Sequence, residues 1–218
     1  MNQAWSELNK TMQAQIKKKD TCEAGIDTLF DLRNQLMETL TSFNEELSRE
    51  EFDAIPFINA DGYHSKTIAY SIWHIFRIED IVAHTLIGED EQVFFAGNYQ
   101  ERINSPIITT GNELVKEQIA DFSKQLNLKE LYAYIFEVKD STEKIIDSLS
   151  YDDLKKKISE ERKEYLKSLN VVSNDENAIW LIDYWCGKDI RGLIQMPFSR
   201  HWIMHIEASL RIKNRIHS

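Results

Sequence analysis

Residues 128–149 read LKELYAYIFEVKDSTEKIIDSL and have the clearest hydrophobic periodicity of the chain. Its seam positions recur at alternating intervals of three and four residues: Leu128, Leu131, Ile135, Val138, Thr142, Ile145 and Leu149. That interval is the period of an α-helix with a narrow packing face, whereas a half-buried strand alternates every second residue. The stretch therefore predicts a long helix that packs against other helices.

The sequence on either side repeats the helical period. Besides 128–149, long helices are expected over residues 26–43, 65–87 and 197–216, the last with Pro197 in its first turn, where a missing N–H costs little. Shorter helices are expected around 5–16, at a capping box over 48–51, inside 89–111, from a second capping box at 110–113 to 125, and within 151–172 and 174–186. We therefore predict an all-α single domain over residues 1–218, a four-helix bundle with additional short helices in long connections.

The composition excludes several classes of function. The formal net charge of -10 repels phosphate backbones, so no nucleic-acid partner is expected, and Lys17-Lys18-Lys19 reads as a solvated helix end. No apolar stretch approaches the ~20 residues that span a bilayer, so no membrane association is expected. The two cysteines, Cys22 and Cys186, lie far apart in sequence and are expected to be free thiols of a cytoplasmic protein.

The histidines carry the functional signal, beginning with His201 and His205. They are four residues apart on the last expected helix and share one face. That face also holds Phe198 and Trp202, so both imidazoles are expected to point into the core. Two neighbouring buried imidazoles cannot both be charged cheaply, and a divalent metal resolves this because it binds several neutral imidazoles at once. A core histidine satisfied by a carboxylate or a carbonyl is the alternative.

A site with two histidines needs a third ligand, and His74 is the best candidate. It lies midway along the expected helix 65–87, at the edge of the apolar arc beside Ile78 and Ile81. The other three histidines are expected in solvated positions: His84 on the polar face with Arg77 and Asp80, His64 in a loop and His217 at the chain end.

Glu79 falls near the centre of the same apolar arc, where a carboxylate needs a cation or a hydrogen-bond donor. Two interpretations follow. The carboxylate either orients a metal ligand from behind, as metal sites often require, or pairs with a core-facing arginine in a structural role. The structural interpretation is the preferred one.

Two runs of sequence resemble the DinB/YfiT-like family. Residues 71–80 (SIWHIFRIED) resemble the histidine-bearing second helix of that family, and residues 197–205 (PFSRHWIMH) resemble its last bundle helix. The order and spacing of the runs agree with the family along most of the chain, including the connection around Thr110 and Gly111. The resemblance implies a four-helix bundle, often dimeric, that binds zinc or nickel through His74, His201 and His205.

The resemblance also implies a class of activity. Some members of the family are metal-dependent transferases that act on low-molecular-weight thiols such as bacillithiol or mycothiol, and others are described as metal hydrolases. The expectation is a transferase with a small-molecule thiol as substrate. A hydrolase, for which Glu79 is the one candidate base, and a non-enzymatic ligand-binding bundle are the alternatives. Trp180, Tyr184 and Trp185 would line a pocket in the last case, although such a cluster is more often core.

Overall fold

The helix that the seam predicts is α8, which spans Leu128–Asp147. The computed structural model describes residues 2–218. The side chain of Asn127 caps α8 by accepting a hydrogen bond from the backbone N–H of Glu130 at 3.3 Å. The central seam residues Leu131, Ile135, Val138 and Thr142 are buried. The interval of three and four residues thus places one face of α8 in the core.

Three further long helices join α8. They are α2 (Cys22–Glu46), α4 (Ile68–Asp80) and α12 (His201–Ile216). A π-helical stretch, Ile81–Gly88, continues α4, and another, Met196–Arg200, leads into α12 with Pro197 in its first turn. Among residues 2–218 no strand forms, and the one β-bridge joins Lys157 to Asp189. The all-α prediction is therefore confirmed.

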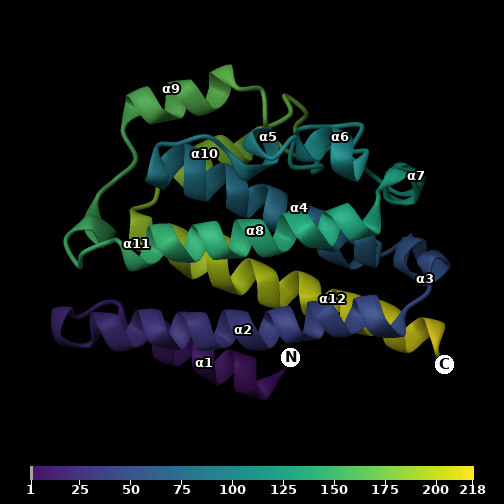
Figure 1. The fold of residues 1–218 in the computed structure, drawn as a ribbon, viewed down its shortest axis with the longest axis horizontal. Coiled ribbons are helices and arrows are strands. Elements are labelled where there is room, and N and C mark those ends of the chain that lie inside the picture. Colours follow the sequence, from purple (N-terminus) through teal and green to yellow (C-terminus); the bar gives the residue numbers. More distant parts are fainter. Residues whose placement is uncertain (1) are drawn as a thin grey trace.

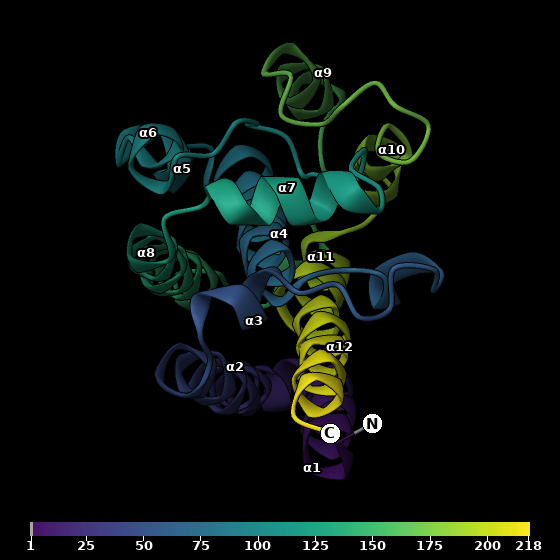
Figure 2. The same cartoon turned by 90° about the vertical axis from the view of Figure 1, so that its right-hand side faces the viewer.

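The four long helices lie side by side. Figure 1 shows α2 and α12 running in one direction and α4 and α8 in the other, and Figure 2 views the group from one end. α4 packs against α8 and α12, while α2 packs against α12 and α8. Because α4 and α8 run in the same direction, the chain between them must cross back over the length of the group. The long connections therefore follow from the topology.

Short elements fill the connections. They are α1 (Gln3–Gln15), α3 (Arg49–Asp53), α5 (Val93–Ala96), α6 (Tyr99–Ile103), α7 (Glu117–Gln125), α9 (Glu160–Ser168), α10 (Trp180–Cys186) and α11 (Ile190–Gln195), with 3-10 turns at 19–21, 62–64 and 153–155. The capping box of α3 is present as predicted, between Ser48 and Glu51. The second predicted capping box is wrong. Residues 110–113 form a turn instead, because Gly111 adopts a φ of +76°, and α7 begins later, at Glu117.

Arg33 joins the four long helices at one point. Its guanidinium, on α2, donates to both oxygens of Glu79 on α4 at 2.7 and 2.9 Å, and to Glu143 on α8 at 2.9 Å. It also donates to the carbonyl of Phe198, before α12, at 3.0 Å, and lies 4.4 Å from the ring centroid of Trp202. Arg33 and Glu79 are wholly buried. Burying two charges costs free energy that is offset only when the pair has good geometry and its remaining donors are hydrogen-bonded. The partners of Arg33 lie on different helices, so this condition restricts how the helices can pack.

The prediction of a polar, solvated face on α4 is wrong. His84, Arg77 and Asp80 are all buried, because the connection after residue 88 covers that face. Asp80 accepts hydrogen bonds from the backbone N–H groups of Val93 and Phe94 at 2.8 and 2.9 Å, and Arg77 donates to a carbonyl of the connection. The Nδ1–H of His84 donates to Asp90 at 2.6 Å, and its Nε2 forms a hydrogen bond with the hydroxyl of Ser141 at 3.1 Å. These polar groups are structural partners of the connection.

We expect Glu79→Gln to lower the free energy of unfolding by about 3–5 kcal/mol, because it leaves the buried charge of Arg33 without its main partner. Urea denaturation measures this. The double variant Arg33→Met/Glu79→Gln should be less destabilised than the sum of the single variants, since no uncompensated guanidinium remains. Glu7→Gln, which breaks the exposed pair with Lys10, is the control and should leave the midpoint unchanged. Simple additivity of the two core substitutions would contradict the role given to this pair.

Candidate metal centre

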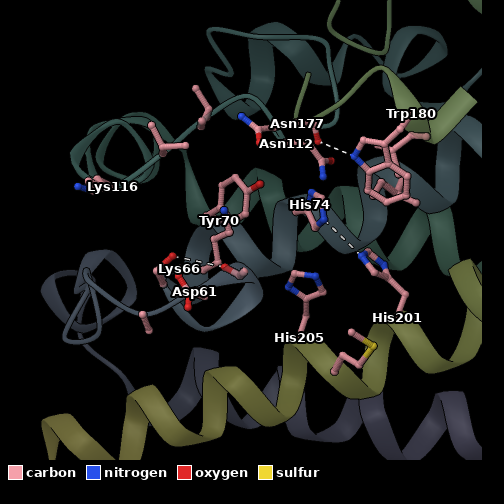
Figure 3. Close-up of a pocket in the computed structure, with 18 of the residues that line it drawn as sticks. Asp61, Lys66, Tyr70, His74, Asn112, Lys116, Asn177, Trp180, His201 and His205 are labelled. Carbon is pink, nitrogen blue, oxygen red and sulfur yellow. Dashed lines mark hydrogen bonds between the residues drawn. The ribbon is translucent and has the colours of Figure 1, made fainter. Parts of the chain in front are cut away.

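Three buried histidines meet between α4 and the start of α12. One ring nitrogen from each of His74, His201 and His205 lies within 4.8 Å of the other two. The ring centroids are 5.1 Å apart for His74 and His201, 4.8 Å for His74 and His205, and 4.6 Å for the pair on α12. Figure 3 shows the three imidazoles converging from the two helices. The structure thus brings together the three residues that the sequence selected.

The orientation of His74 is fixed by the main chain. Its Nδ1 lies 2.7 Å from the carbonyl oxygen of Thr110, and because a carbonyl only accepts, Nδ1 must carry the proton. In the neutral ring Nε2 then carries no proton, and its lone pair lies within hydrogen-bond distance of the Nε2 of His201, at 3.3 Å. Tyr70, one turn earlier on α4, stacks on the His74 ring at 5.3 Å and donates to the carbonyl of Gly111 at 2.8 Å. The carbonyl groups of Thr110 and Gly111 therefore fix the orientations of His74 and Tyr70 on α4.

The three imidazoles are neutral near physiological pH. Burial lowers the pKa of His74 to about 4, and the bond to Thr110 offsets only part of that effect. Burial, and then the neighbouring imidazoles, hold the pKa values of His201 and His205 well below the ordinary range. Neutral imidazoles are the form that binds metals, so protons do not compete for the site at neutral pH.

The donor set fits a divalent transition metal. Imidazole nitrogen suits zinc, nickel, copper and iron. Two nitrogens bound at ~2.0–2.1 Å in tetrahedral geometry lie roughly 3.3 Å apart, which matches the separation between the Nε2 atoms of His74 and His201. Three protein ligands also leave coordination positions for a substrate, as catalytic sites require. The residues are therefore competent to hold a divalent ion.

A cavity of about 780 Å³ adjoins the three imidazoles. Its walls come from the loop 58–66, the turn 112–116, α10 and the segment around Met196 and Met204. The volume lies within the range of about 300–1,000 Å³ that is typical of small-molecule sites. A molecule in this cavity would lie directly against the ligand nitrogens.

The structure also places the other residues that the sequence singled out. Glu79 accepts hydrogen bonds from Arg33 and, at 2.7 Å, from the indole N–H of Trp202, and no hydrogen bond joins it to the three imidazoles. All three aromatic residues line the cavity: Trp185 is buried, in agreement with a core role, whereas Trp180 is 49% exposed and Tyr184 is also partly exposed. Cys186 is half-buried, and burial raises the pKa of its thiol to about 11, so it is protonated at neutral pH. His217 lies at the chain end, where it pairs with Glu51.

Some residues at the site gave no signal in the sequence. Lys66 and Tyr70 shape the centre, yet each reads as an ordinary residue beside or within a helix. Thr110 stands in the predicted capping box and in the connection that the family resemblance covers, but nothing in the sequence indicates that its carbonyl orients His74.

No protein-family model matches the sequence, and no curated protein matches it significantly. In the part of the chain that the structure describes, no helix has the length and apolar character needed to cross a membrane.

We expect the purified chain to bind about one divalent ion, and His74→Ala and His205→Ala each to lose it, because two imidazoles hold an ion far less tightly than three. Mass spectrometry of the metal content, with added zinc and nickel, measures this. His217→Ala, which removes a histidine at the chain end, is the matched control and should keep the ion. Retention of the ion in both cluster variants would place it elsewhere.

We also expect the metal-free protein to lose stability as the pH falls from about 6.5 to 4. An unfolded histidine has a pKa near 6.5, whereas that of folded His74 is about 4, so the unfolded state takes up the proton first. The contribution of His74 is fully present above pH ~6.5, and its loss amounts to the order of 3 kcal/mol at pH ~4. Urea denaturation across this range should show a shallower decline for His74→Leu. Parallel declines in the two proteins would contradict this account.

Proposed function

We propose that this chain is a divalent-metal enzyme of the DinB-like class, folded as a four-helix bundle, that transfers the sulfur of a low-molecular-weight thiol to an electrophile. One observation carries the proposal: His74, His201 and His205 lie within 4.8 Å of one another at the wall of a cavity of about 780 Å³. Zinc or nickel are the ions that we propose. An ion held by these imidazoles would act as a Lewis acid and lower the pKa of a thiol or a water beside it.

The fold positions the three imidazole nitrogens that would bind the ion. The bond from His74 to Thr110 presents one nitrogen lone pair toward the cavity, and the i, i+4 spacing on α12 presents His201 and His205 from the other side. The cavity is large enough for a thiol together with a small electrophile. In the reaction the sulfur forms a bond to the electrophilic carbon, the leaving group departs with the electron pair of the broken bond, and the thiol proton passes to solvent.

The lining of the cavity favours thiol transfer over hydrolysis. A hydrolase benefits from a general base within reach of the attacking water. Glu79, the candidate base, is engaged with Arg33 and Trp202 in the core. Among the described residues that line the cavity, Asp61 is the single carboxylate, and it lies in the exposed loop before α4. A thiol needs less help, because its pKa is already near 8.5 and an adjacent cation suffices to ionise it.

We expect the zinc- or nickel-loaded protein to couple 2-mercaptoethanol or bacillithiol to 1-chloro-2,4-dinitrobenzene, measured by the absorbance of the thioether product. The rate should require both the ion and the thiol. In His205→Ala it should fall at least about 100-fold, because loss of a ligand should cost more than loss of a group that only orients a ligand, which typically costs about 10–100-fold. His217→Ala should keep the rate. Release of nitrophenol from a nitrophenyl ester by metal and water alone, without thiol turnover, would favour the hydrolase. Ligand-dependent melting shifts without turnover would favour a binding protein.

A further inference from the structure

Lys66 places an ammonium group at the cavity without an acidic partner. Its Nζ lies 4.9 Å from the ring centroid of Tyr70, and no described carboxylate lies within ion-pair distance of it. Burial lowers the pKa of Lys66 to about 8, so the group is still mostly protonated at neutral pH. A partly desolvated cation without a counter-ion is unfavourable, and it is unexpected in a chain with a formal net charge of -10. The ammonium therefore favours an anion from outside the chain.

The position of Lys66 is set by the start of α4. The next residue, Thr67, is buried and caps the helix by accepting from the backbone N–H of Tyr70 at 3.0 Å. The hydroxyl of Thr67 also lies 2.6 Å from that of Ser123 on α7. The backbone at Lys66 is thus anchored on two helices, and its side chain lies over the ring that stacks on His74.

Among the described groups that line the cavity and could bind an anion, Lys66 is the cation nearest the three imidazoles. The hydroxyl of Tyr70 already donates to Gly111, and the three imidazoles are neutral. Lys116 is the second lysine of the cavity, but it is exposed at the rim, where the turn enters α7. Asp61, the one carboxylate of the lining, is exposed and makes no ion pair with Lys66.

The opposite side of the cavity is apolar. In Figure 3, Lys66 and Trp180 lie on opposite sides of His74. Trp180 and Tyr184 pack edge to face, with ring centroids 5.6 Å apart, and both are partly exposed beside the cavity. Between the two sides, the buried amide oxygen of Asn112 has no hydrogen-bond partner among the described residues. The cavity therefore offers a cation, an amide and an aromatic surface around the three imidazoles.

We propose that the substrate of this cavity is a thiol that carries a carboxylate, which binds Lys66 while the sulfur reaches the site of His74, His201 and His205. This inference rests on the proposed function, because it assigns the substrate of the same site. A carboxylate is favoured over a phosphate because one lysine ammonium balances one negative charge, and no arginine fork lines the described cavity. The aromatic side then receives the electrophile.

The test uses the cobalt-loaded protein, in which a thiol bound to the ion gives a charge-transfer absorption band. The probes are 3-mercaptopropionate and its uncharged analogue 3-mercaptopropionamide, and the quantity is the ratio of their dissociation constants. Comparing this ratio between variants cancels the difference between the two thiol pKa values. We expect Lys66→Met to reduce the relative preference for the acid about tenfold, the size of a charge-assisted hydrogen bond, and Lys66→Arg to retain it. Lys116→Met is the matched control and should leave the ratio near that of the wild type.

An unchanged ratio in Lys66→Met, with the band intact, would overturn the subsite while leaving the thiol function standing. Absence of the band for both thiols in cobalt-containing protein would instead refute the proposed function. In that case calorimetry with 3-phenylpropionate and 3-phenylpropionamide decides on the subsite alone. A preference for the acid that Lys66→Met abolishes supports it, and equal or no binding overturns it. Circular dichroism melting of both Lys66 variants establishes that they fold.

Discussion

The guanidinium of Arg33 contacts all four long helices or their immediate approaches in the centre of the core. It reaches Glu79, Glu143 and the carbonyl of Phe198, so one buried cation sets the packing of α2, α4, α8 and the approach to α12. Trp202 donates to the same carboxylate and lies one residue after His201. The rotation of α12 that turns His201 and His205 toward His74 is therefore decided by the charge network in the core. Fold and site share one set of hydrogen bonds.

The sequence predicts a residue's position well where the periodicity of its own helix decides whether the side chain points into the core. The seam of α8 and the placement of His201 and His205 in an apolar arc need only the helical period. His74 could be selected in the same way. Arg77, Asp80 and His84 could not be placed, because a polar residue on a helix reads as solvated until the segment that covers it is known. Most of their partners come from residues 90–108, which show no periodicity, and the others are Tyr134 and Ser141 on α8.

The residues that line the cavity could not be grouped from the sequence either. The cavity is lined by residues from segments that are far apart in the sequence: Lys66 before α4, Asn112 in the turn before α7 and Trp180 at the start of α10. Only the long connections bring these segments together. The aromatic residues of α10 read as core because large apolar side chains usually are, and for Trp185 this is right. Trp180 and Tyr184 differ because the chain leaves an opening beside them. Chemistry that depends on several segments is visible only in three dimensions.

The turn at Thr110 and Gly111 has an evolutionary consequence. The proton position on His74 is set by a main-chain oxygen, which no substitution at residue 110 can remove. Gly111 is different, since a Cβ there would lie 3.0 Å from both Trp73 and Tyr70 and its backbone is left-handed. The hydrogen bond to His74 therefore does not depend on the chemistry of the side chain at residue 110, whereas a side chain at residue 111 would strain the turn. Selection on this turn is therefore expected to act on its backbone shape and, at the wholly buried residue 110, on the size of the side chain.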